Sequence, residues 1–178
     1  MVGVELTPAE LTVLGLVVER PRHGYDLEQV IERRGIRRWT DIGFSSIYYL
    51  LERLHKRGLV HVPRAPDAAR SRRVFHATGA GREAARAGAL ALIRGPAPAA
   101  HPVLAGIAHL DLLTPAEYTA ALGERLAALQ ERIAAVRAAQ DAQEPLPRAA
   151  REVFSYSLSL MEAERTWLAA RARVHDDR

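Results

Sequence analysis

The chain has 178 residues, of which 48% are hydrophobic and 26% are charged, and it contains no cysteine. This length and composition suit one folded domain or two small ones, and the missing cysteine excludes disulfides, cysteine-ligated metals and thiol nucleophiles. The net charge is only +4 at pH 7, so the positions of the charges carry more information than their sum.

No stretch of the sequence has the pattern of a leader or of a membrane span. The first 20 residues lack the basic stretch with which a secretory signal opens. The apolar run at 11–18 is much shorter than the roughly 20 residues of a membrane helix. We therefore expect a cytoplasmic protein.

Three helices are predicted before residue 58, at 8–19, 24–34 and 44–57. Each has apolar residues three or four positions apart, which form one stripe on a helix. The first helix opens with the pentapeptide Leu-Thr-Pro-Ala-Glu. In it, Thr is suited to cap the helix, Pro to start its first turn and Glu to reach back to the cap. The third helix ends at Gly58, because glycine commonly terminates helices.

The pattern changes after the third helix. Residues 59–62 and 74–78 are short runs typical of β-strands. The segment at 63–73, between them, is rich in turn formers and holds four arginines against one aspartate. The sequence therefore predicts a β-hairpin with a basic tip, followed by a fourth helix at 80–93.

The rest of the chain is predicted to be helical, at 102–110, 115–140 and 146–174. In the two long helices, apolar residues repeat at spacings of three and four, the pattern of a seam between packed helices. Two such helices joined by a short Pro-containing turn have more apolar surface than they can cover between themselves, so we expect a homodimer. The predicted dimerisation residues are Leu122, Leu126, Leu129, Ile133, Phe154, Leu158, Met161 and Leu168.

A break rich in proline separates the two halves. The predicted organisation is a DNA-binding domain at 1–94, a linker at 95–102 and a helical dimerisation domain at 103–178. Residues 1–94 have a net charge of +6, and the remainder has a net charge of −2. An uneven charge of this kind is expected when one half of a chain contacts a polyanion.

Three helices followed by a hairpin is the order of elements in a winged helix-turn-helix, whose third helix enters the major groove of DNA. The predicted fold class is therefore mainly α: a winged helix-turn-helix with a small β-hairpin, plus a C-terminal antiparallel helical domain. Basic and hydroxyl side chains fall on the third helix and on the hairpin, the two elements that contact DNA in this motif. The predicted DNA-binding residues there are Ser45, Ser46, Tyr48, Tyr49, Arg53, Lys56, Arg70, Arg72 and Arg73.

Several of these side chains also have a purely structural interpretation. Tyr48 lies beside apolar neighbours in the sequence and suits a core position. Ser45 and Ser46 suit a helix cap. Arg53 suits an ion pair with Glu52 or a neighbouring acid, and the hairpin arginines suit a solvated loop.

Three stretches of the sequence resemble motifs of the PadR family of bacterial transcriptional regulators. Residues 21–27 read PRHGYDL, similar to the family's P-x-H-G-Y-E-L. Residues 45–60 read SSIYYLLERLHKRGLV, similar to G-T-L-Y-P-A-L-x-R-L-E-x-x-G-L-I, with Ser45 in place of Gly and Tyr49 in place of Pro. Residues 72–81 read RRVFHATGAG, similar to R-x-Y-x-L-T-x-x-G, with Phe75-His76-Ala77 in place of the usual Tyr-containing strand.

The resemblance implies a dimeric DNA-binding regulator, usually a repressor, that binds inverted-repeat operators. It implies that Tyr25 lies near the DNA backbone and that the C-terminal helices form the dimer. Many family members release DNA when a small aromatic or multidrug-type molecule binds. Trp39, Tyr156 and Trp167 are candidates for lining such a pocket, although aromatic residues at helical spacing are more often part of a core.

Other classes of function fit the sequence less well. A phosphate-cradling glycine loop, G-x-S-x-G and H-E-x-x-H are all missing from the sequence. We therefore expect no enzyme, no cofactor and no metal. A coiled-coil adaptor would account for the C-terminal helices but would leave the basic hairpin without a role.

Overall fold

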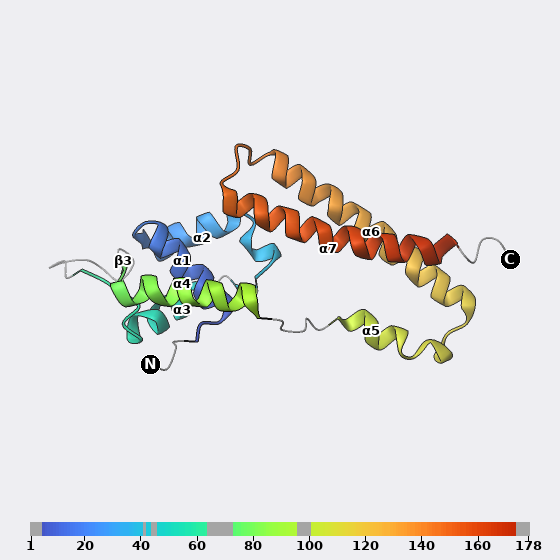
Figure 1. The fold of residues 1–178 in the computed structure, drawn as a ribbon, viewed down its shortest axis with the longest axis horizontal. Coiled ribbons are helices and arrows are strands. Elements are labelled where there is room, and N and C mark those ends of the chain that lie inside the picture. The colour runs from blue at the N-terminus through green and yellow to red at the C-terminus, as the bar shows by residue number, and fades with distance from the viewer. Residues whose placement is uncertain (1–4, 41, 44–45, 64–72, 96–100, 174–178) are drawn as a thin grey trace. The chain divides into compact units, whose positions relative to one another are not determined.

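The computed structural model describes residues 5–40, 42–43, 46–63, 73–95 and 101–173. Its contacts divide the chain into two compact units, Met1–Pro98 and Ala99–Arg178. Most of the predicted linker lies outside the described residues. Figure 1 labels the main elements of both units.

The N-terminal unit opens with three helices, α1 (Pro8–Glu19), α2 (Gly24–Arg33) and α3 (Ser46–Lys56). The capping pattern expected from the sequence is present at α1. The Thr7 hydroxyl accepts a hydrogen bond from the Glu10 N–H at 3.2 Å, and the Glu10 carboxylate accepts one from the Thr7 N–H at 2.9 Å. A short 3₁₀ turn, η1 (Ile36–Arg38), lies between α2 and α3.

A three-stranded antiparallel sheet takes the place of the predicted two-stranded hairpin. Its strands are β1 (Arg22–His23), β2 (Val60–His61) and β3 (Val74–Ala77), in the order β1-β3-β2. The added strand β1 comes from the turn between α1 and α2 and pairs Arg22 with Phe75. It has only two residues, too few for a repeating pattern in the sequence. The buried Arg22 side chain holds this turn, because its Nε donates to the Leu16 carbonyl at 2.9 Å.

The apolar stripes of α1, α2 and α3 meet β3 and α4 (Gly79–Arg94) in one hydrophobic core. Leu14, Leu27 and Leu51 lie at its centre with no exposed surface. The start of α4 approaches β2 closely: a Cβ on Gly81 would lie 2.0 Å from the carbonyl oxygen of Leu59. The core thereby fixes α3 and the wing strands to one another.

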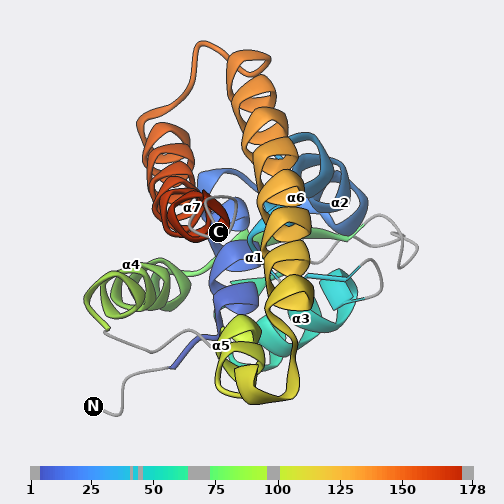
Figure 2. The ribbon, with the colours of Figure 1, turned by 90° about the vertical axis from the view of Figure 1, so that its right-hand side faces the viewer.

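The C-terminal unit is helical in all of its described elements, which are α5 (Pro102–Ile107), η3 (Leu110–Leu112), α6 (Pro115–Asp141) and α7 (Arg148–Arg173). Figures 1 and 2 both show α6 and α7 side by side, and a turn of six residues joins them as an antiparallel pair. Leu122, Leu129, Ile133 and Leu168 are buried between them. Within the described part of the chain, no helix is long and apolar enough to cross a bilayer.

Candidate nucleic-acid interface

Helix α3 divides cleanly into a buried and an exposed side. Ile47, Leu50, Leu51 and Leu54 face the core. At about 100° per residue, the middle of the opposite side is occupied by Tyr48, Tyr49, Glu52 and Lys56. Tyr48 is 52% exposed, so its interpretation as a core residue is wrong. This exposed side is the part of α3 that is available to DNA.

The first turn of α3 is held by a serine. The Ser46 hydroxyl donates to the Gly43 carbonyl at 2.6 Å. This is not the cap weighed for Ser46, because a capping hydroxyl accepts from a backbone N–H, and the Ser46 hydroxyl keeps its acceptor capacity for another partner. The other predicted residue of this turn, Ser45, lies outside the described residues.

The ring of Tyr48 lies against the start of α2. A Cβ on Gly24 would lie 2.5 Å from the ring of Tyr48, so only glycine leaves room for this ring against the first turn of α2. The next residue, Tyr25, is 61% exposed. The glycine thus allows Tyr48 of α3 to lie at the start of α2.

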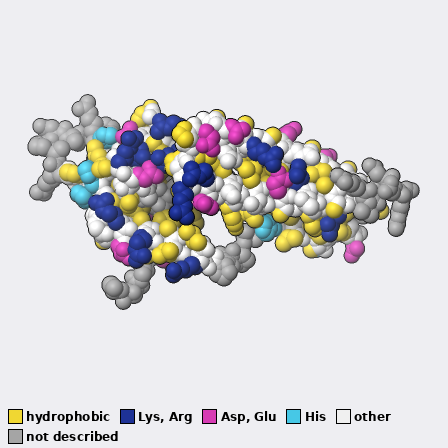
Figure 3. Space-filling view, turned by 45° about the horizontal axis from the view of Figure 1, so that its top comes forward, with side chains coloured by type: hydrophobic (Ala, Val, Ile, Leu, Met, Phe, Trp, Pro, Cys, Tyr) yellow, Lys and Arg dark blue, Asp and Glu magenta, His cyan; other side chains and the backbone are white. Residues whose placement is uncertain are grey.

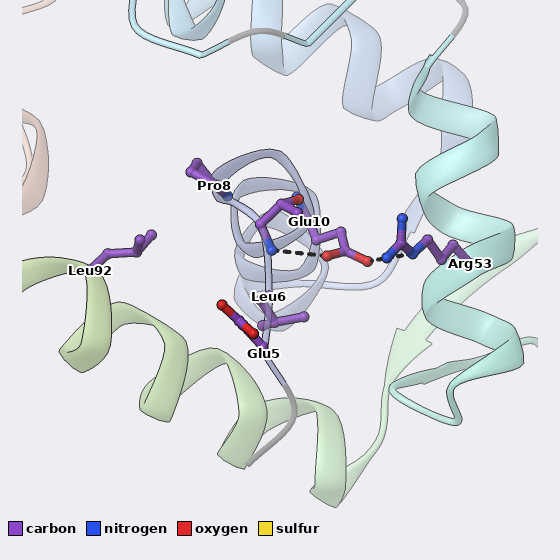
Figure 4. Close-up of a pocket in the computed structure, with 7 residues that line it drawn as sticks. Glu5, Leu6, Pro8, Glu10, Arg53 and Leu92 are labelled. Atoms are coloured by element: carbon purple, nitrogen blue, oxygen red, sulfur yellow. Dashed lines mark hydrogen bonds and ion pairs between the residues drawn. The ribbon is translucent and has the colours of Figure 1, made fainter. Parts of the chain in front are cut away.

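A buried carboxylate of α1 holds two arginines, Arg53 of α3 and Arg57 directly after it, and Figure 4 shows the contact with Arg53. Glu10 is only 1% exposed, and its Oε1 lies 3.0 Å from Arg53 Nε and 2.7 Å from Arg57 Nη1. Arg57 also donates to the Glu5 carbonyl at 2.8 Å. Burial alone would raise the pKa of Glu10, but the Thr7 N–H and the two guanidinium groups outweigh it and hold the pKa below its usual value. We call Glu10, Arg53 and Arg57 the α1–α3 clamp.

A cleft of about 370 Å³ lies beside the α1–α3 clamp, shown in Figure 4. Its walls include Glu5, Leu6, Pro8 and Leu92 together with the clamp residues Glu10 and Arg53. The three predicted effector residues do not line it. Trp39 is half exposed in the N-terminal unit, whereas Tyr156 and Trp167 belong to the C-terminal unit.

Arg73, directly before β3, is the predicted wing arginine that the structure describes. Arg73 forms an ion pair with Glu52 of α3, and its guanidinium lies 5.1 Å from the centre of the Phe75 ring. The predicted contacts Arg70 and Arg72 lie outside the described residues. Figure 3 shows basic and acidic side chains interspersed on the face that it draws, in keeping with the many ion pairs formed by arginines.

Two of the predicted DNA-binding arginines are therefore held in ion pairs within the protein. Arg53 pairs with an acid, as one alternative held, but the acid is Glu10 of another helix rather than a sequence neighbour. Arg73 is likewise paired with Glu52. From the sequence, Glu52 was a candidate only as a partner of Arg53, and Glu10 only as a helix-capping residue. The one available signal was the capping motif, which marked Glu10 as a helix-start residue and not as a partner of α3.

The predicted dimerisation residues lie mostly inside the C-terminal unit. Leu122, Leu129, Ile133 and Leu168 are buried between α6 and α7, and Leu126, Leu158 and Met161 pack against them. Phe154 is half-buried. The predicted seam is therefore occupied within one chain. The exposed apolar residues of α7 are different ones, namely Val153, Tyr156 and Leu160.

Residues 13–87 match the model of the transcriptional regulator PadR-like family. This range contains α2, α3, all three strands and most of α1. This part of the chain is therefore similar to a family of transcriptional regulators.

Several solved structures share the fold of this chain. A crystal structure of Bacillus subtilis PadR in complex with operator DNA aligns with a TM-score of 0.74 at 15% identity, covering 94% of this chain and 99% of that one. Bacillus subtilis PadR in complex with p-coumaric acid gives 0.77 at 16% identity, with coverages of 94% and 98%. The Vibrio cholerae virulence activator AphA gives 0.71 at 17% identity, with the same coverages. A comparison with curated proteins gave no match.

Proposed function

We propose that this chain is a PadR-like regulator that binds double-stranded DNA as a homodimer at an inverted-repeat operator and represses transcription. The observation that carries the proposal is the exposed side of α3, which offers Tyr48, Tyr49 and Lys56 above a fully buried apolar side. A helix of this kind, fixed by a core and followed by a wing, is the reading element of a winged helix. The Bacillus subtilis PadR complex with operator DNA supports the assignment.

Affinity and sequence preference come from different groups in this proposal. Lys56 and the arginines at 64–72 contact phosphates, so that affinity falls as salt rises. Ser46, Tyr48 and Tyr49 lie nearest the base edges at the start of α3 and contribute to the sequence preference. Tyr25 contacts the backbone. In a dimer, two such helices meet half-sites about one turn of DNA, or a multiple of about 34 Å, apart.

The exposed stripe of α7 supports the homodimer. Val153, Tyr156 and Leu160 lie three and four positions apart on one side of the helix, away from the buried α6–α7 seam. A stripe with this spacing suits packing against another helix. We therefore place the dimer contact on this stripe rather than on the predicted seam residues.

A small aromatic effector is the second part of the proposal. Bacillus subtilis PadR has been solved in complex with p-coumaric acid. In the C-terminal unit of this chain, Tyr156 is 70% exposed, and Trp167 is half-buried with the Arg171 guanidinium 3.9 Å from the centre of its ring. An aromatic ring with an adjacent guanidinium suits a phenolic carboxylate, since the ring stacks and the cation pairs with the acid.

The test is binding to the DNA upstream of the protein's own gene, measured by fluorescence anisotropy at several salt concentrations. We expect saturable binding that is at least about a hundredfold tighter than to a shuffled sequence, and release by a phenolic acid with a change in tryptophan fluorescence. Equal affinity for both DNAs would contradict sequence-specific recognition. No binding to either DNA would favour the coiled-coil adaptor instead.

A further inference from the structure

The exposed side of α3 carries an acid where a DNA-binding surface would be expected to be basic. Glu52 lies between Tyr48 and Lys56 on this side, and its side chain is 45% exposed. A carboxylate facing the phosphates of DNA is repelled by them. An acid in the middle of this side therefore needs a partner that offsets its charge.

Arg73, which directly precedes β3, fixes the Glu52 carboxylate. The ion pair joins Arg73 Nη1 to Glu52 Oε1, and the guanidinium also lies over the ring of Phe75, which is buried in the core. Arg73 is thus held from the side of the sheet, and it offsets the charge of Glu52. A carboxylate has acceptor positions for about four hydrogen bonds on its two oxygens, so one ion pair leaves capacity for another donor.

We infer that Glu52 reads a cytosine in the major groove and that Arg73 is its positioning residue. This inference rests on the proposed function. A carboxylate is an acceptor only, and the matching donor in the major groove is the N4 amino group of cytosine. Guanine offers the acceptors N7 and O6 on its major-groove edge and repels the carboxylate. The Glu52 carboxylate, positioned by Arg73, therefore attracts cytosine and repels guanine.

The competing interpretation is that the pair only braces α3 against β3. A brace would affect folding and the affinity for all DNA sequences alike. A reading residue would change the preference at one position of the site and leave the other positions as they are. The base preference therefore separates the two interpretations.

The experiment selects binding sites from a randomised DNA pool with the full-length protein and with Glu52→Gln. We expect the wild type to require cytosine at one position in each half-site, with a loss of about tenfold on replacing it. Glutamine pairs with adenine N6 and N7, so Glu52→Gln shifts that single position from cytosine to adenine. Glu52→Ala removes the preference there. The matched control is Glu83→Gln, which breaks an exposed ion pair with Arg86 in α4 and leaves the selected site unchanged.

Arg73→Ala tests the positioning role. We expect it to weaken the preference for cytosine at the same position while the remaining positions keep theirs, and Arg73→Lys to restore part of it. Thermal melting of each variant confirms that the protein is folded. If Glu52→Gln melts at a lower temperature than the wild type, Glu52→Asp gives the same test. Its shorter side chain loses the contact with the cytosine amino group and therefore the preference for cytosine.

The outcomes distinguish this inference from the proposed function. If the wild type enriches no sequence, the proposed sequence-specific binding fails. If the wild type enriches a site and Glu52→Gln and Glu52→Ala enrich the same one with the same base at every position, DNA binding stands and the reading role of Glu52 is overturned. A uniform loss across all sequences in these variants would also overturn it, in favour of the brace.

Discussion

Single residues show how one motif takes two different roles in this chain. The pentapeptide Leu-Thr-Pro-Ala-Glu opens both α1 and α6, and in both places it forms the same capping box. At α6, Glu117 is exposed and bonds only to Thr114 in the described structure. At α1, Glu10 is buried and also holds Arg53 of α3 and Arg57 directly after α3. The sequence predicted both helix starts but not the arginines, since Arg57 lies 47 positions away.

The first prediction compares Glu10 with Glu117. Glutamine keeps a capping box but loses the charge, so Glu10→Gln should cost about 2 kcal/mol of unfolding free energy, whereas Glu117→Gln should cost little. Urea unfolding followed by circular dichroism measures both. Equal losses in the two variants would mean that the α1–α3 clamp adds nothing to the cap.

The pH dependence of the clamp follows from the lowered pKa of Glu10. A group whose pKa is lower in the folded protein stabilises it above the pKa of the unfolded chain, and this contribution is lost as the pH falls through the folded value. We therefore expect the stability difference between wild type and Glu10→Gln to be constant from pH 7 to about pH 5 and to shrink below the usual glutamate value near 4.5. Urea unfolding at pH 7 and at pH 3.5 checks this. A difference that grows toward low pH would contradict it.

Elements were predicted well where a pattern repeats and poorly where it does not. The amphipathic helices α1, α2, α3 and α4 begin and end within about two residues of their predicted ranges. Strand β1 was missed because pairing with β3, rather than its own sequence, makes it a strand. The exposed side of α3 followed from its periodicity. The suggested pairing of its acid Glu52 with Arg53 was wrong, because the fold brings Arg73 to Glu52 and Glu10 to Arg53.

The junction of β2 and α4 gives a prediction at this scale. Gly81→Ala places a methyl group 2.0 Å from the Leu59 carbonyl oxygen, so α4 or the strand must shift, at a cost of about 1–3 kcal/mol. Two residues earlier, a methyl group on Gly79 meets nothing within 4 Å of the described atoms. Thermal melting should show a lower midpoint for Gly81→Ala and an unchanged one for Gly79→Ala. Similar midpoints for both variants would argue against the close approach.

The α1–α3 clamp also predicts which basic residues at the C-terminal end of α3 contact phosphates. Lys56 is exposed, whereas Arg57 is bound to Glu10 and to the Glu5 carbonyl. On the proposed function, Lys56→Ala should reduce the slope of log affinity against log salt by about one, and Arg57→Ala should leave it nearly unchanged. Anisotropy titrations at four salt concentrations measure both slopes. A larger change for Arg57→Ala would mean that DNA releases it from Glu10.

At the scale of the whole molecule, periodicity identified packed helices but not their partners. The seam at Leu122, Leu129 and Ile133 has the spacing of a helix interface, and it is filled by α7 of the same chain. A sequence pattern does not distinguish contacts within one chain from contacts between two, because the same side chains suit both. The exposed apolar stripe of α7 could be recognised only after the structure showed which apolar residues α6 and α7 bury against each other.

The proposed dimer contact is tested at the exposed stripe of α7, which consists of Val153, Tyr156 and Leu160. Tyr156→Glu places a charge in the middle of the exposed apolar residues and should raise the dimer dissociation constant at least about tenfold. Ser155→Glu, one position away on a different side of α7 and also exposed, should leave it unchanged. Sedimentation velocity over a range of protein concentrations gives both constants. Equal dissociation constants for wild type and Tyr156→Glu would move the interface elsewhere.

The order of the small sheet has a consequence for how binding specificity can be exchanged. Strand β3 is the central strand, so it is paired on both edges, with His23 opposite Val74 and His61 opposite His76. The two ends of the connection between β2 and β3 are therefore anchored independently of what joins them. Because loop closure depends only weakly on length, this connection is a natural site for grafting. A wing of another length or charge inserted there should alter the DNA footprint while α3 keeps its orientation.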